Sequence, residues 1–168
     1  KIGQNIKFDF IVFYKNGINL NSMEDTMLMS YVLDAGKNRH NMDILSEIHL
    51  NHKTISFKDL VGTGKKEINF SDVEIDIAKD YASEDADITY RLYKKFSQSL
   101  KSEKLTNIYE IFEKPMIKIL AFMEIEGIKV DSKFLKTLSS KFEKKIETIQ
   151  TQIFKISKKE FNIASPKQ

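Results

Sequence analysis

The chain has 168 residues, of which 41% are hydrophobic and none is cysteine, and its formal net charge is +3. A chain of this length can bury enough surface to form one or two compact units without a disulfide or a structural metal. The lack of cysteine excludes disulfide scaffolds, thiol nucleophiles and cysteine zinc sites, and it is compatible with a cytoplasmic location. No apolar run approaches the roughly 20 residues that a membrane span needs, so no membrane partner is expected.

Charge is unevenly distributed along the chain. Residues 1–130 contain 18 Lys and Arg and 20 Asp and Glu, whereas residues 131–168 contain 9 Lys and 4 acidic residues. The two stretches therefore carry net charges of −2 and +5 and are expected to present different surfaces. The overall charge is too small to indicate nucleic-acid binding by itself. Because the sequence opens on Lys1 with neither a Met nor a signal-peptide pattern, we expect it to be part of a longer protein.

Hydrophobic spacing predicts three short helices in the first 50 residues. The first spans Asn5–Tyr14 and is followed by Gly17, a residue typical of the position just past a helix C-terminus. The second is capped by Asp25-Thr26, and the third covers Asn41–Leu50. The apolar faces predicted for the second and third helices consist of Met27, Leu28, Tyr31 and Val32, and of Met42, Leu45, Ile48 and His49.

The middle of the chain is predicted to be a loop followed by two longer helices. Residues 51–72 show no helical period and contain Gly62-Thr63-Gly64-Lys65-Lys66, which favours a loop. The helical period returns near Val73 and continues to Phe96, ahead of the polar stretch 97–104. Within that stretch, residues 101–104 are the candidate domain boundary. A further helix is expected up to Gly127, with Pro115 either kinking it or opening a new helix.

The last predicted element is the longest. Asp131 is in position to cap it, and its apolar residues recur at steps of three and four, as in a coiled-coil seam with lysines on the other faces. The pattern indicates a helical hairpin or arm. The seam consists of Leu135, Leu138, Phe142, Ile146, Ile149, Ile153 and Ile156.

Three side chains are candidates for chemistry. Tyr81 and Asp85 are four residues apart, so on a helix they lie on one face about a turn from each other. Such a pair suits metal-assisted hydrolysis, in which a carboxylate holds a divalent ion and a phenol orients the attacking water. Asp9, in the first turn of the first helix, is in position to face a second, distant carboxylate. The plain alternative is that Tyr81 packs in the core, Asp85 is solvated and Asp9 interacts with the helix dipole.

Seven ordered segments make the chain resemble the family A DNA polymerases, the family of bacterial DNA polymerase I. They run in register along nearly the whole sequence and are specific as a set. They are GQNIKFD at 3–9, DTMLMSYVLD at 25–34, RHNMDIL at 39–45, HKTISF at 52–57, YASEDADIT at 81–89, EKPMIKIL at 113–120 and EGIKVD at 126–131. The resemblance implies a DNA-directed DNA polymerase with 3′→5′ proofreading exonuclease activity, acting in replication and repair.

The resemblance also implies the fold and the domains. Residues 1–104 are similar to the C-terminal part of an α/β, ribonuclease H-like exonuclease domain. Residues 105–168 are similar to the first helices of the polymerase domain, which lead toward the thumb, so this stretch of the family is mostly α-helical. The first exonuclease motif, an Asp-x-Glu on a strand, has no counterpart here. Two of the four expected carboxylates are therefore missing, and the isolated chain is expected to be inactive although its parent protein is active.

The functional residues of the family transfer residue by residue. Asp9 matches the acid of the second exonuclease motif, and Tyr81 and Asp85 match the third. The match implies two Mg²⁺ or Mn²⁺ ions, of which Asp85 ligates the one that binds the attacking water and Asp9 helps to hold the second. It also implies that Tyr81 orients the water. The implied partner is DNA, as a single-stranded 3′ end at this site and as a primer-template in the parent. The residues implied to contact the DNA strand are Gln4, Asn5, Phe8, Arg39 and Phe57.

Two further expectations concern partners. If residues 1–104 lack most of a sheet, the helix faces at 27–32, 42–48 and 77–96 are left uncovered, so the chain is expected to self-associate or to retain an N-terminal piece. The competing interpretation is a non-catalytic helical module that binds DNA or a protein through the basic stretch after Lys133. Convergence of Asp9 and Asp85 on one site favours the enzyme, and divergence into solvent favours the module.

Overall fold

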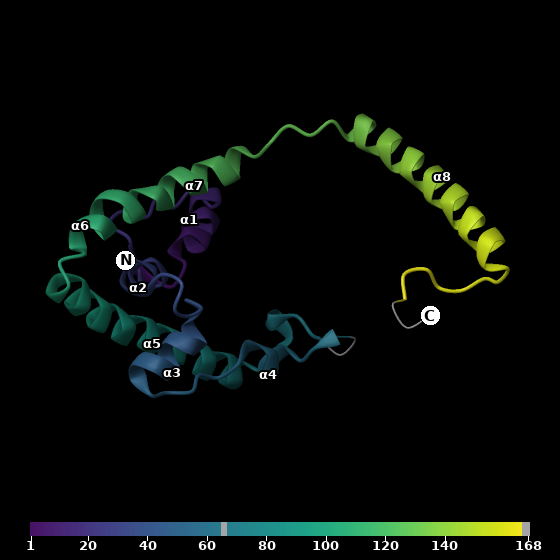
Figure 1. The fold of residues 1–168 in the computed structure, drawn as a ribbon. Coiled ribbons are helices and arrows are strands. Elements are labelled where there is room, and N and C mark those ends of the chain that lie inside the picture. The colour runs from purple at the N-terminus through teal and green to yellow at the C-terminus, as the bar shows by residue number, and fades with distance from the viewer. Residues whose placement is uncertain (65–66, 166–168) are drawn as a thin grey trace. The chain divides into compact units, whose positions relative to one another are not determined.

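The computed structural model describes residues 1–64 and 67–165. Its regular elements are two very short strands and a majority of helices, as the sequence predicts (Figure 1). The chain divides into two compact units, Lys1–Glu126 and Gly127–Gln168. The elements of the first unit are β1 (Ile2–Gly3), α1 (Ile6–Lys15), β2 (Glu24–Asp25), α2 (Thr26–Asp34), α3 (Met42–Leu50), α4 (Phe57–Val61), the 3-10 helix η2 (Phe70–Asp72), α5 (Ile75–Ser102), α6 (Thr106–Ile108), the π-helix η3 (Tyr109–Glu113) and α7 (Lys114–Glu126). The second unit contains α8 (Ser132–Ser157).

The strand pair and the tight turn after it fix the start of α1. β1 and β2 pair in parallel, with Gly3 opposite Asp25. The turn into α1 passes through Asn5, whose φ of 59° lies in the left-handed region that asparagine tolerates better than most residues. A Cβ on Gly3 would lie 2.9 Å from the Cβ of Ile6, which is closer than such atoms pack. Glycine at this position therefore lets α1 fold back against β1 and places Asp9 beside the strand pair.

The main core of the first unit lies between α2, α3 and α5. Much of the helix faces that we expected to be uncovered is instead buried between these helices, so that expectation is wrong for the residues of the cluster, whereas Ile77 at the start of α5 is exposed. The buried cluster consists of Met29, Leu45, Ile88, Leu92, Phe96, Leu100 and Tyr109. Two residues of the predicted apolar faces, Tyr31 and Ile48, are exposed. The buried face of α2 therefore differs from the predicted one. Its N-cap, Asp25, is buried, and Met29 and Ser30 are the residues of α2 that are buried with it.

A second cluster joins α1 to α7, which lie side by side (Figure 1). Phe10 of α1 packs with Ile117 and Ala121 of α7, and its ring meets the edge of Phe122 with the ring centroids 5.8 Å apart. The compact unit therefore continues to Glu126, beyond the boundary that we expect near residue 104 from the family resemblance. The domain boundary near residue 104 stays a prediction.

The stretch 51–72 is not an unbroken loop. It contains α4 and η2, which have five and three residues and are too short to produce a visible helical period in the sequence. Lys65 and Lys66 of the predicted loop lie outside the described residues.

Pro115 marks a change in helix geometry. The π-helix η3 ends at Glu113, and α7 begins at Lys114, so Pro115 is the second residue of the new helix. Proline is tolerated in the first turn of a helix because the N–H that it lacks has no partner inside that turn. Of the two predicted alternatives, the structure has the one in which a new helix opens.

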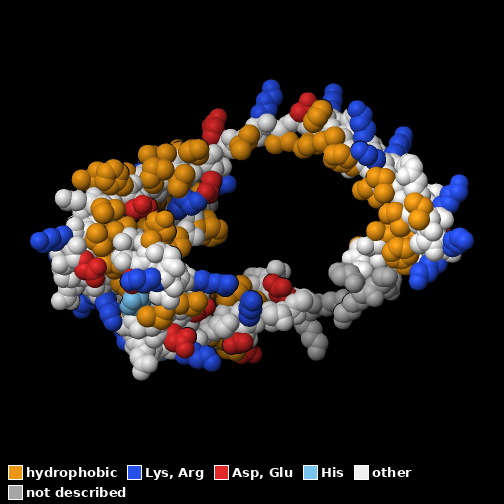
Figure 2. All heavy atoms as spheres, in the orientation of Figure 1, with side chains coloured by type: hydrophobic (Ala, Val, Ile, Leu, Met, Phe, Trp, Pro, Cys, Tyr) orange, Lys and Arg blue, Asp and Glu red, His pale blue; other side chains and the backbone are white. Residues whose placement is uncertain are grey.

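The second unit consists mainly of α8. The Asp131 carboxylate accepts a hydrogen bond of 2.9 Å from the backbone N–H of Phe134, which confirms the predicted cap. None of the residues of α8 is buried, so the predicted seam has no partner helix in the described part of this unit. Figure 2 shows lysines along one side of α8 and hydrophobic side chains along the other. Within the described residues, no helix combines the length and the apolar character of a membrane span.

Candidate active site

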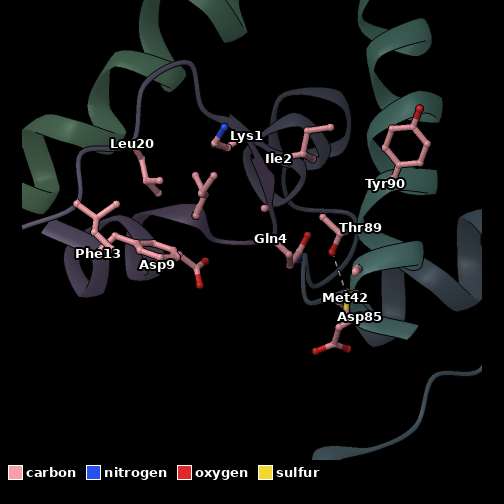
Figure 3. Close-up of a pocket in the computed structure, with 14 residues that line it drawn as sticks. Lys1, Ile2, Gln4, Asp9, Phe13, Leu20, Met42, Asp85, Thr89 and Tyr90 are labelled. Atoms are coloured by element: carbon pink, nitrogen blue, oxygen red, sulfur yellow. Dashed lines mark hydrogen bonds between the residues drawn. The ribbon is translucent and has the colours of Figure 1, made fainter. Parts of the chain in front are cut away.

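Asp9 and Asp85 line the same cavity of the first unit, which has a volume of about 810 Å³. Asp9 comes from the first turn of α1, and Asp85 comes from the N-terminal half of α5. Figure 3 shows both carboxylates pointing into the same open space. This is the geometry expected of the enzyme interpretation rather than of the binding module, while the chemical roles of the two residues stay predictions.

Both carboxylates are held in a partly desolvated environment. Burial raises the pKa of Asp9 and the pKa of Asp85 above the usual aspartate value, and in Asp85 a hydrogen bond from Tyr81 offsets part of the effect. The Oδ1 atom of Asp85 is buried and has no hydrogen-bond partner among the described residues. An unsatisfied buried acceptor is unfavourable, and a bound cation would relieve it.

The donor chemistry of this pair suits a divalent ion. Carboxylate oxygens are the ligands that Mg²⁺ and Mn²⁺ prefer. In residues 1–64 and 67–165, however, no three or more His, Cys, Asp or Glu side chains gather closely enough to hold a metal ion. Asp9 and Asp85 therefore fit as part of a metal site, and a complete site needs ligands beyond these two.

Tyr81 lies next to Asp85 and belongs to a cluster of three aromatic rings. Burial, followed by the charge of Asp85, raises the pKa of Tyr81 to about 12, so its hydroxyl stays protonated at neutral pH. Its ring centroid is 6.0 Å from that of Phe57 on α4 and 6.0 Å from that of Phe70 on η2, and these two phenylalanines stack on each other at 5.8 Å. The phenylalanine side chains remain partly exposed. Sequence reasoning missed Phe70 because it lies in the stretch predicted to be a loop.

Glu84 ties the segment before α4 to α5. Its Oε1 lies 2.7 Å from Nε2 of His52, and its Oε2 accepts a hydrogen bond of 2.6 Å from the backbone N–H of Ile55. Burial acts to raise the pKa of Glu84, but these hydrogen bonds outweigh it and the pKa is lowered. The clamp holds Phe57 near Tyr81. Sequence reasoning missed it, since the only signal was an acid adjacent to Asp85.

The residues expected to contact DNA are not all at the cavity. Gln4 lines it, and its side chain donates to the carbonyl of His40 at 2.7 Å. Asn5 forms the turn before α1 and lines a separate, smaller cavity beside α7. The exposed side chains of Phe8 and Arg39 are not part of the cavity lining. The contacts of these residues with DNA stay predictions.

Two acidic side chains that converge beside a tyrosine on a helical scaffold are typical of metal-dependent phosphodiester hydrolysis. Residues 1–101 match the family model of the 3′-5′ exonuclease of the family A DNA polymerases. The chain therefore belongs to this exonuclease family.

Individual relatives match over the whole chain. It is 44% identical to DNA polymerase I of Rhizobium leguminosarum over 100% of its length and 38% identical to DNA polymerase I of Borreliella burgdorferi over 99%. The chain spans only 16% and 18% of these two relatives. Among solved structures, it is similar to the POL domain of Pol1 from M. smegmatis in complex with DNA primer-template and dNTP. That match has 22% identity and a TM-score of 0.76 and covers 100% of this chain and 26% of the other. This likeness supports the fold of the chain beyond residue 101.

Proposed function

We propose that the chain is part of a DNA polymerase I and that it contributes to the site where this protein hydrolyses DNA from its 3′ end. The observation that carries the proposal is the convergence of Asp9 and Asp85 on one cavity, with Tyr81 beside Asp85. DNA-directed polymerisation belongs to the same complete protein in this proposal, and its location is the cytoplasm, where bacterial DNA lies.

Each of the three side chains has a defined task. Asp9 and Asp85 hold two divalent ions, Mg²⁺ or Mn²⁺, together with carboxylates from the Asp-x-Glu motif expected elsewhere in the complete protein. When bound, such ions supply Lewis acidity that activates water and stabilises the leaving 3′ oxygen. The Tyr81 hydroxyl, which its pKa of about 12 keeps protonated, orients the attacking water by a hydrogen bond.

The aromatic cluster, Arg39 and Gln4 bind the unpaired DNA strand. Phe57 and Phe70 present partly exposed rings beside Tyr81, and such rings suit stacking on an unpaired base. The exposed guanidinium of Arg39 suits a phosphate, and Gln4 at the cavity wall suits the terminal nucleotide. The substrate of this site is a single-stranded DNA 3′ end, and primer-template DNA is bound by the complete protein.

The isolated chain is inactive in this proposal. Residues 1–104 contribute the exonuclease part and residues 105–168 the beginning of the polymerase part, so both activities need residues from elsewhere. Apolar side chains on the cavity wall, among them Ile2, Phe13, Ile18 and Leu20, suit coverage by a further segment of the complete protein. In the isolated chain, a retained N-terminal piece or a second copy covers them.

The competing binding module has one observation in its favour. α8 is basic, and none of its residues is buried, although Phe161 from the segment after it contacts Phe154. It does not account for two carboxylates that line one cavity and whose pKa values are both raised by partial burial.

The test is exonuclease activity of the complete protein on single-stranded DNA with Mg²⁺ or Mn²⁺. Asp85→Ala should remove the activity because an ion ligand is lost. Tyr81→Phe should keep the metal and lower the rate by about 10- to 100-fold, because the water loses its hydrogen-bond partner. Polymerase activity serves as the control for folding in both variants. Exonuclease activity that Asp85→Ala leaves unchanged would contradict the proposal.

A further inference from the structure

A buried carboxylate joins the starts of two helices in the first unit. Asp25 is 1% exposed. Its Oδ1 accepts hydrogen bonds from the backbone N–H groups of Asn5 at 3.1 Å, Met27 at 2.9 Å and Leu28 at 3.3 Å. Its Oδ2 accepts from the N–H of Ile6 at 2.9 Å. One side chain therefore caps α2 in the ordinary way and also accepts from the N–H of Asn5, just before α1, and of Ile6, the first residue of α1.

A tyrosine from a distant part of the chain is hydrogen-bonded to the backbone of Asp25. Tyr109 of η3 is 1% exposed. Its hydroxyl accepts a hydrogen bond of 2.9 Å from the N–H of Asp25 and donates one of 3.0 Å to Oε2 of Glu24. Lys114 of α7 contacts the other oxygen of Glu24 at 2.5 Å. Both residues of β2 are thus fixed by side chains that come after residue 104.

These contacts form a continuous path to the candidate site. Asp9 lies three residues after Ile6 in the first turn of α1, so the contacts that fix the backbone at Ile6 also fix the position and the Cα–Cβ direction of Asp9. Tyr109 holds Asp25, Asp25 holds the start of α1, and α1 carries Asp9 into the cavity that Asp85 also lines.

We propose that Asp25 and Tyr109 are positioning residues of the exonuclease site, through which the segment after residue 104 sets the geometry of Asp9 relative to Asp85. This inference rests on the proposed function. It goes beyond that function because Tyr109 lies outside residues 1–101, the part that matches the exonuclease family model. The scaffold of the site therefore includes the first helices of the part assigned to the polymerase.

The inference is tested in the complete protein with Tyr109→Phe. This substitution keeps the ring that fills the core and removes only the hydroxyl. Tyr31→Phe is the matched control, because it removes a hydroxyl from an exposed ring for which the structure shows no hydrogen bond among the described residues. The measured quantities are the Mn²⁺ affinity of the exonuclease site, taken as the binding that Asp85→Ala removes, and the Mn²⁺ concentration at half-maximal hydrolysis.

Tyr109→Phe should weaken this Mn²⁺ binding and raise the half-maximal concentration by about tenfold, as expected for a residue that orients a metal ligand. At saturating Mn²⁺ most of the hydrolysis rate should return, and polymerase activity should not change. Tyr31→Phe should behave as the unmodified protein. A residue that only stabilised the fold would shift the urea midpoint without changing the metal dependence.

The possible failures are distinguishable. If the unmodified protein shows no Mn²⁺ binding that depends on Asp85, the proposed function fails. If that binding exists and Tyr109→Phe leaves its affinity unchanged in a folded protein, the positioning role is overturned while the proposed function stands. If Tyr109→Phe does not fold, Asp25→Asn decides in its place, since it keeps the shape of the side chain and replaces the Oδ2 that accepts from the N–H of Ile6 with an amide nitrogen that cannot accept. Weaker Mn²⁺ binding then supports the inference, and unchanged binding overturns it.

Discussion

Two residues of α5 should differ sharply in their contribution to stability. Leu92 is 0% exposed and lies in the main core between α2, α3 and α5, whereas Ile77 is 49% exposed near the start of the same helix. The sequence places both on one apolar stripe and gives no reason to rank them. The perturbations that separate them are Leu92→Ala and Ile77→Ala.

The expected magnitudes follow from burial. Leu92→Ala removes a fully buried side chain from a packed cluster, which costs about 3 to 5 kcal/mol because a cavity is left. Ile77→Ala loses the partial burial of one side chain, which costs about 1 kcal/mol of stability. The higher helix propensity of alanine offsets about 0.3 kcal/mol of this cost. The difference of about 2 kcal/mol or more corresponds to about 6 °C or more in melting temperature.

The assay is urea unfolding of the 168-residue chain, followed by circular dichroism at 222 nm. A midpoint shift for Leu92→Ala that is several times the shift for Ile77→Ala agrees with the packing. Equal shifts would show that the first turns of α5 are covered as completely as its middle, and the assignment of the core to α2, α3 and the later turns of α5 would then be wrong.

Three further predictions use the same chain. Burial, followed by Lys95, lowers the pKa of His49 below its usual 6.5, so the folded state binds fewer protons than the unfolded state and stability should fall as the pH drops through 6.5. His49→Gln should lose this dependence, and unfolding midpoints that still fall equally between pH 8 and pH 5 would refute it. Asp131→Ala should destabilise α8 by about 1 kcal/mol by removing its cap, seen as reduced helical signal on heating, whereas Ser139→Ala in the same helix should not. The purified chain should neither extend a primer nor shorten single-stranded DNA, and activity that purifies with the chain would contradict its assignment as an incomplete site.

Local signals in the sequence predict the starts of α2 and α8. The carboxylates of Asp25 and Asp131 accept hydrogen bonds from backbone N–H groups two or three residues later, and such a local contact is predictable from residue type and position alone. The length of α5 was underestimated because the polar stretch after Phe96 continues the helix on its exposed side while Leu100 remains buried.

Long-range contacts account for what the sequence did not predict. The buried face of α2 depends on where Asp25 points, and Asp25 is held by Tyr109, 84 residues away along the chain. Phe70 reaches the ring of Tyr81 only because η2 brings it there. The convergence of Asp9 and Asp85 followed from the family resemblance and not from spacing, because no periodic pattern relates α1 to α5.

The most direct test of the central claim is the position of Mn²⁺ in crystals of the complete protein. Anomalous scattering locates the ion independently of any assumed mechanism. We predict Mn²⁺ in the cavity, with one ion bonded to a carboxylate oxygen of Asp85 at about 2.0 to 2.2 Å and a second ion beside Asp9, and the loss of the first ion in Asp85→Ala crystals. A protein that hydrolyses DNA 3′ ends while its Mn²⁺ lies away from both carboxylates would contradict the account.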